Sequence, residues 1–104
     1  MVVKDDLLEQ VLLLTRQMRE QAQQAAWEEA ERTEVQRSRL IAECFDGEEA
    51  FGDQMLAANK VQEIIRLDTE IMAIGDRSRD EIRTQLNRLQ QGRQVAKAYR
   101  RFSR

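Results

Sequence analysis

The residues that most often carry out catalysis are scarce in this chain. It contains one cysteine, Cys44, and no histidine, so a Cys–His nucleophile pair and a Cys/His zinc site both lack partners. Adjacent carboxylates occur at Glu28–Glu29, Glu48–Glu49 and Asp80–Glu81, but neighbours on a helix do not face each other. The four glycines are scattered along the sequence and form no phosphate-binding loop. The sequence therefore predicts a protein that is not an enzyme and holds no metal or cofactor.

The chemistry that remains is the binding of another protein. Residues 92–104 hold five basic residues and no acid, whereas residues 25–53 hold three arginines and nine acids. Aromatic and apolar side chains on a helical face rich in arginine suit partner binding. The candidate partner-binding residues are Leu86, Leu89, Val95, Tyr99 and Phe102. The alternative is that Val95, Tyr99 and Phe102 pack back onto the first helix of the chain.

The composition predicts long helices. Of the 104 residues, 35% are charged and none is proline, which is typical of coiled-coil and long-helix proteins. Residues 55–89 carry a stripe of apolar and small side chains at steps of three and four, the spacing of one face of an amphipathic helix. This expected face contains Ala58, Val61, Ile64, Ile65, Asp68, Ile71, Met72, Gly75, Ser78, Ile82, Leu86 and Leu89.

Shorter helices must lie along this long one. We expect helix 1 at about 5–24, helix 2 at about 26–45, an acidic loop at 46–53, the long helix at about 54–91 and a short C-terminal helical segment at 92–104. Asp5 or Asp6 is expected to cap helix 1, and Asp53 the long helix. Gly75 and Asp76 could divide the long helix, but Gly75 is in phase with the stripe, which favours a continuous helix. The prediction is one all-α domain over 1–104, an antiparallel helical bundle of two shorter helices packed on one long helix.

Three residues of the expected bundle have a specific role in it. Trp27 is expected to anchor helix 2 against the long helix, and Cys44 to be a small core residue. Asp68 lies within the expected apolar face of the long helix, and a buried carboxylate needs a partner, so we expect an ion pair with Arg37 or Arg39. The alternative is that Asp68 makes a polar contact with a partner protein.

Three stretches of the sequence resemble the FliT family of flagellar type III export chaperones. They are AAWEEAERTEVQRSRLIAECF at 25–45, IIRLDTEI at 64–71 and QQGRQVAKAYR at 90–100. The resemblance implies a cytoplasmic chaperone that binds the C-terminal region of FliD, the filament-cap protein, before export. It also implies contacts with the export ATPase complex and, in some members, inhibition of the flagellar master regulator FlhDC. The family's C-terminal segment can fold over the partner surface, and the corresponding segment here, 93–104, is short.

Two other functions fit parts of the sequence. One is a homodimeric coiled-coil adaptor with no export role, although the stripe lacks a strict heptad seam. The other is a nucleic-acid-binding module that uses residues 93–104, for which five charges without a base-reading motif predict only weak, salt-sensitive binding. The longest apolar run, Val11–Leu14, is far shorter than the about 20 residues that span a membrane.

Overall fold

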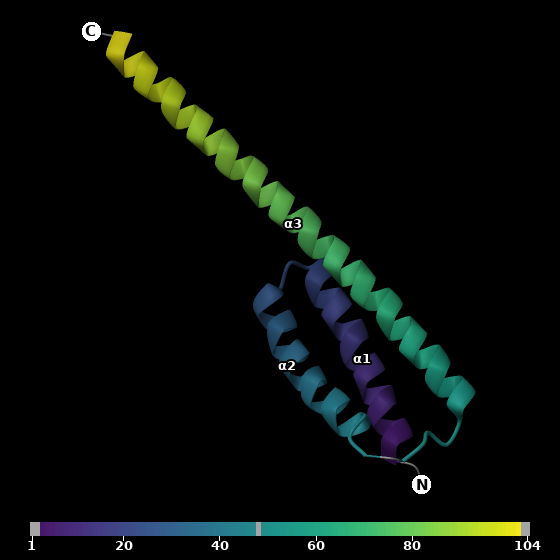
Figure 1. The fold of residues 1–104 in the computed structure, drawn as a ribbon. Coiled ribbons are helices and arrows are strands. Elements are labelled where there is room, and N and C mark those ends of the chain that lie inside the picture. Colours follow the sequence, from purple (N-terminus) through teal and green to yellow (C-terminus); the bar gives the residue numbers. More distant parts are fainter. Residues whose placement is uncertain (1–2, 48, 103–104) are drawn as a thin grey trace. The chain divides into compact units, whose positions relative to one another are not determined.

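The computed structural model describes residues 3–47 and 49–102, with side chains at 4–47, 49–92 and 97. Three helices account for almost all of this part of the chain (Figure 1). They are α1 (Val3–Gln23), α2 (Trp27–Cys44) and α3 (Gln54–Phe102). The predicted all-α fold, with two shorter helices packed on a long one, is confirmed. The chain divides into two compact units, Met1–Ile74 and Gly75–Arg104.

The long helix continues through both of its glycines. Gly75 lies inside α3, as predicted, but so does Gly92, where the sequence analysis placed the start of a separate segment. A Cβ atom added at Gly92 would have no neighbour within 4 Å, so no close approach of another segment requires a glycine there. An interior glycine costs a helix only about 1 kcal/mol, which is too little to end a helix with good helix formers on both sides.

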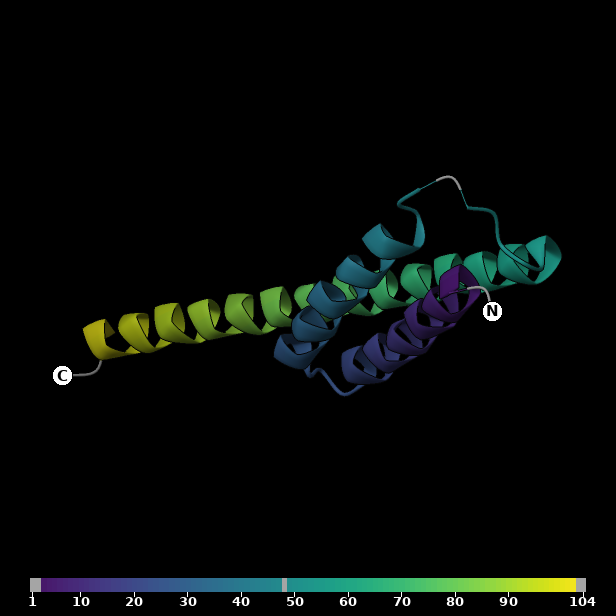
Figure 2. The ribbon, with the colours of Figure 1, turned by 90° about the horizontal axis from the view of Figure 1, so that it is seen from below.

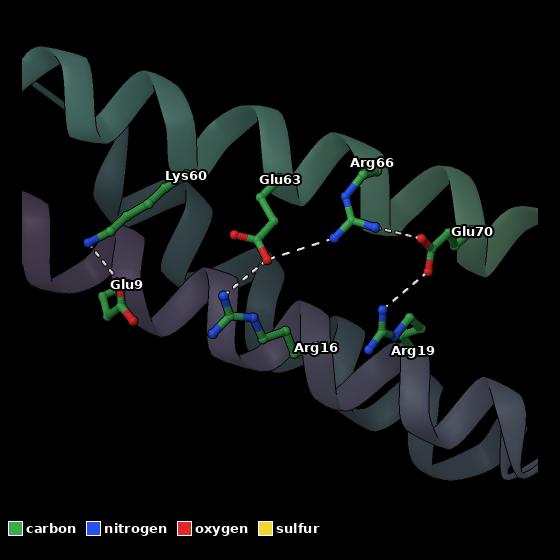
Figure 3. A network of polar contacts seen from close by, with 7 residues as sticks. All are labelled: Glu9, Arg16, Arg19, Lys60, Glu63, Arg66 and Glu70. Atoms are coloured by element: carbon green, nitrogen blue, oxygen red, sulfur yellow. Dashed lines mark hydrogen bonds and ion pairs between the residues drawn. The ribbon is translucent and has the colours of Figure 1, made fainter.

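In the first unit α1 and the beginning of α3 run in the same direction, and α2 runs antiparallel to both (Figures 1 and 2). Ion pairs along the α1–α3 contact show this direction, because the residue numbers rise together on the two helices (Figure 3). The nitrogen–oxygen distances are 2.7 Å for Lys60–Glu9, 3.0 Å for Arg16–Glu63 and 3.3 Å for Arg19–Glu70. These side chains are partly exposed, so each pair stabilises the bundle by at most about 1 kcal/mol.

A single hydrophobic cluster joins the three helices. Its buried residues are Leu8, Val11 and Leu12 of α1, Cys44 of α2, and Ala57, Ile64 and Leu67 of α3, with Leu7, Leu40, Ile41, Phe51 and Val61 packed against them. The α1 members follow steps of three and four, so one face of that helix is apolar.

The predicted face of α3 was right for Val61 and Ile64 but wrong in part, because the buried side is rotated about the helix axis. Leu67, left out of the expected stripe, is 1% exposed, whereas Ile65 and Met72, included in it, are 60% and 69% exposed. Ile64, Ile65 and Leu67 occupy three of four consecutive positions, and successive residues are turned by about 100°. These apolar side chains therefore span about 160°, nearly half of the helix circumference. Spacing alone could not decide which part of it α1 and α2 would cover.

The loop between α2 and α3 is tied to the start of α1. The Gly52 N–H donates to both carboxylate oxygens of Asp5, at 3.2 and 3.1 Å. Phe51 packs edge-on against Phe45 with ring centroids 6.1 Å apart, and the Lys4 ammonium lies 4.7 Å from the Phe51 ring centroid. The expectation that Asp5 or Asp6 caps α1 is wrong, because the helix already begins at Val3.

The start of α3 is capped as predicted. Asp53 precedes the first residue of the helix, and its carboxylate accepts a hydrogen bond from the Leu56 N–H at 3.0 Å. This bond satisfies one of the backbone donors that a helix leaves without an internal partner at its first turn. Asp53 thus fixes where the long helix begins, directly after the loop that Asp5 holds.

The end of α1 has an alanine in a conformation that favours glycine. Ala25 has φ of 56°, and its N–H donates to the Ala22 carbonyl at 3.0 Å while the Ala26 N–H donates to the Gln21 carbonyl at 2.8 Å. These two bonds make a Schellman motif, whose left-handed position is usually glycine. A side chain in that conformation costs about 1–2 kcal/mol.

We therefore expect Ala25→Gly to raise the free energy of unfolding. Relief of the left-handed strain exceeds the larger entropy loss of glycine, which is about 0.5–1 kcal/mol, so the net gain is about 0.5 kcal/mol. Urea unfolding followed by circular dichroism measures it. The matched control is Ala42→Gly at an exposed position inside α2, which should lower the stability by about 1 kcal/mol. A loss of stability in both variants would contradict the assignment of strain to Ala25.

Candidate functional site

The second unit carries a row of exposed apolar side chains on α3. Ile82, Leu86 and Leu89 are 54%, 55% and 60% exposed, and their spacing of four and three places them on one face of the helix. We call these three residues the apolar stripe. Every residue from Arg79 to Gly92 is exposed, so no described residue of the second unit covers the stripe.

The candidate site of the sequence analysis lies only partly within the described side chains. Leu86 and Leu89 are exposed on the same face of α3, as a binding role requires. The side chains of Val95, Tyr99 and Phe102 lie outside the described part of the structure, although their backbone belongs to α3. Ile82 belongs to the face of the long helix that was expected to pack, and it was not predicted to bind a partner. Its spacing from Leu86 was the signal that could have added it to the site.

Basic residues flank the apolar stripe. Arg83 and Arg88 are exposed, and neither forms an ion pair with another described residue. One helical turn earlier, Arg79 pairs with Asp76 at 3.2 Å. With both partners more than two-thirds exposed, that pair contributes little to stability. The stripe and its rim thus combine apolar anchors with arginine, the combination enriched at protein interfaces.

A second exposed apolar pair lies on the α3 segment of the first unit. Ile65 and Met72 are seven residues apart and therefore on the same side of the helix. The sequence analysis placed both in the core and missed them as surface residues. They are the second candidate for a protein contact, but they are fewer and have no row of unpaired arginines beside them. We therefore take the stripe as the candidate site.

A polar centre lies where the three helices meet, and it consists of Thr15, Glu34, Arg37 and Asp68. Arg37 is 8% exposed. Its Nη1 donates to Asp68 Oδ1 at 2.6 Å and to Thr15 Oγ1 at 3.3 Å, and its Nη2 donates to Glu34 Oε2 at 2.6 Å. The predicted pairing of Asp68 with Arg37 or Arg39 is confirmed, with Arg37 as the partner. One arginine thereby links α1, α2 and α3.

The polar centre holds the helices in register rather than forming a ligand site. Thr15 is fully buried, and its hydroxyl also donates to the Val11 carbonyl at 2.8 Å. The hydrogen bond that Thr15 accepts from Arg37 was not predicted. A threonine on the apolar face of α1 was the feature of the sequence that could have indicated it. The Arg37 Nε is buried without a partner among the described residues. Both Nη atoms nonetheless have acceptors, which lie on α1 and α3 for Nη1 and on α2 itself for Nη2.

Cys44 is a core residue, as predicted. It is 1% exposed, and its Sγ lies 3.6 Å from the Lys4 carbonyl oxygen, to which the thiol donates. Burial raises the pKa of the Cys44 thiol, partly opposed by the positive charge of Lys4 and reinforced by Asp5. The protonated thiol is a weaker nucleophile than the thiolate. Cys44 therefore packs rather than reacts.

A small cavity lies between α1 and the start of α3. This cavity, lined by Asp5, Leu8, Leu56 and Lys60, has a volume of about 10 Å³, which admits at most one water molecule. Among the described side chains, no group of three His, Cys, Asp or Glu residues is placed to hold a metal ion. Within the same part of the chain, none of the helices is long and apolar enough to cross a membrane. Trp27 is partly exposed, and its anchoring role stays a prediction.

Comparison with protein families gives one match. The model of the family described as Flagellar protein FliT matches residues 5–101. The matched range covers nearly the whole chain and includes the three stretches at 25–45, 64–71 and 90–100 that carry the resemblance. The comparisons with curated proteins and with solved structures found no match.

Proposed function

The chain belongs to the FliT family of flagellar export chaperones, and we propose that it binds the C-terminal region of FliD, the filament-cap protein, before export. The observation that carries this proposal is the apolar stripe. Three large apolar side chains at one face of a helix, each more than half exposed, are the anchors that a partner helix needs to dock. The proposed site is Leu86 and Leu89 together with Val95, Tyr99 and Phe102, and we include Ile82 because it is exposed on the same face as the two leucines.

The proposed activity is masking rather than catalysis. Each apolar side chain of the partner that is covered by the stripe leaves water, which favours the complex by about 25 cal/mol per Å². The same burial hides a segment of FliD that would otherwise be free to associate. The protein would act in the cytoplasm, where the substrate is held before export. Contacts with the export ATPase complex and with FlhDC stay predictions from the family resemblance.

Replacement of two leucines of the stripe by aspartate tests the proposed site. We expect Leu86→Asp with Leu89→Asp to weaken binding of a FliD C-terminal fragment at least tenfold, because two charges must be buried against an apolar partner surface. Isothermal titration calorimetry measures the affinity. The matched control is Leu13→Asp with Val35→Asp, which adds the same charge at positions of similar exposure, 52% and 51%.

The control should change the affinity less than about twofold, since these positions lie outside the proposed site. Equal losses in the two double variants would mean that the stripe is not the site. A loss confined to Ile65→Asp with Met72→Asp would move the site to the other exposed pair. Val95→Asp and Tyr99→Ala then show how far the site extends along α3.

A further inference from the structure

The basic charge of the chain is concentrated beside the apolar stripe. Glu81 is the last acidic residue of the sequence, and seven basic residues follow it within residues 82–104. The stripe begins at the next residue, Ile82. Arg83 and Arg88 lie among its members along the helix and are exposed. Lys97, also exposed, is one of the five basic residues after Gly92.

The acidic residues of the second unit are too few to balance its basic residues. Residues 75–104 contain nine basic and three acidic residues, a net charge of +6. Of the three acids, Asp76 is already paired with Arg79, and the others, Asp80 and Glu81, precede the stripe. Exposed cations in such a row raise the local concentration of anionic ligands and speed their association. The surface is therefore selective by charge as well as by apolar contact.

We propose that the apolar stripe and its basic rim take an acidic amphipathic helix from the partner protein. The apolar face of that helix would contact Ile82, Leu86 and Leu89, and carboxylates flanking the face would pair with Arg83, Arg88 and the basic residues that follow. Arginine suits this role because its planar guanidinium binds a carboxylate through two hydrogen bonds. The inference rests on the proposed function only in taking the partner to be an export substrate.

Two other occupants fit the same surface less well. A second copy of the chain would bring a unit of charge +6 against another of +6, and like charges across an interface oppose association. A nucleic acid would be attracted by the arginines, but its phosphates offer nothing to the apolar stripe, whose side chains would stay in water. An acidic helix with an apolar face is complementary to both features.

A pair of synthetic amphipathic peptides tests the inference on the full chain. The peptides share one leucine face and carry either Glu or Gln at every flanking position. At about 50 mM NaCl we expect the Glu peptide to bind at least tenfold more tightly than the Gln peptide, and at about 300 mM we expect most of this advantage to be lost, because salt screens exposed charges. Fluorescence anisotropy measures both affinities.

Charge reversal locates the contact. Arg83→Glu with Arg88→Glu should remove the preference for the Glu peptide, whereas Arg32→Glu with Arg39→Glu, an equal charge change at exposed positions of α2, should keep it. Equal binding of the two peptides, or equal loss in the two double variants, would overturn the inference. So would tight binding of a single-stranded DNA oligonucleotide that Leu86→Asp leaves unchanged.

The same variants separate this inference from the proposed function. If a FliD C-terminal fragment binds the wild-type chain but is insensitive to Arg83→Glu with Arg88→Glu, the chaperone function stands and the acidic partner helix is overturned. If the FliD fragment does not bind while the preference for the Glu peptide holds, the inference about the surface stands and FliD is the wrong partner.

Discussion

Leu67→Ala is expected to lower the free energy of unfolding by about 3 kcal/mol. Leu67 is 1% exposed and belongs to the core cluster on α3. Removing its branched methyl groups gives up their burial and leaves a cavity between α3 and the other two helices, which closes only in part because a close-packed interior relaxes incompletely. Urea unfolding followed by far-UV circular dichroism measures the change.

Ile65→Ala is the matched control for this variant. Ile65 lies two positions away on the same helix and is 60% exposed, so its truncation should cost less than about 1 kcal/mol. The comparison tests the rotation of α3 directly, because the apolar pattern of the sequence favoured Ile65 over Leu67 as the core residue. A larger loss for Ile65→Ala than for Leu67→Ala would show that α3 packs through the face that the sequence predicted.

Asp68→Ala is expected to destabilise the protein by about 2 kcal/mol, because it leaves the largely buried Arg37 without its shortest cross-helix contact. Asp68 itself is 38% exposed in its side chain, so water can reach the site and the loss is smaller than for a fully buried pair. Asp68→Asn keeps an acceptor oxygen but not the charge, and should lose about half as much. Thermal and urea unfolding measure both variants.

The polar centre should affect stability and not binding. We expect Asp68→Ala to leave the affinity for a FliD C-terminal fragment within about twofold, since Asp68 contacts Arg37 inside the first unit. Asp76→Ala, which removes the exposed pair with Arg79, is the control and should change the stability by less than about 0.5 kcal/mol. A loss of affinity without a loss of stability would make Asp68 a partner contact instead.

The sequence was sufficient for the fold class and for the residues that stand out against their surroundings. Three such residues were predicted correctly. Asp53 precedes a helical run and caps it, Asp68 lies within an apolar face and pairs with an arginine, and Cys44 is a small apolar residue that packs in the core. The buried side of α3 could not be predicted, because the side chains of Ile64, Ile65 and Leu67 together span nearly half of the helix circumference. The position of α1 and α2 decides among them, and that is a property of tertiary packing.

The candidate site was partly predictable for a similar reason. Leu86 and Leu89 were identified because they are apolar residues beside a basic segment. The same spacing extends back through Ile82 into the core of the first unit, and a periodic pattern does not show where a helix stops being covered. Ile65 and Met72 were assigned to the core on the same grounds, and in the structure they are exposed. Exposure of an apolar face depends on which neighbours are present.

Calorimetric titration of the full chain with the C-terminal fragment of FliD from the same organism tests whether the apolar stripe binds this partner. We expect saturable binding with a negative heat-capacity change, the mark of apolar surface removed from water. The affinity should fall at least tenfold when Leu86 and Leu89 are replaced by aspartate. No heat of binding at any temperature, with the chain folded by circular dichroism, would contradict this expectation.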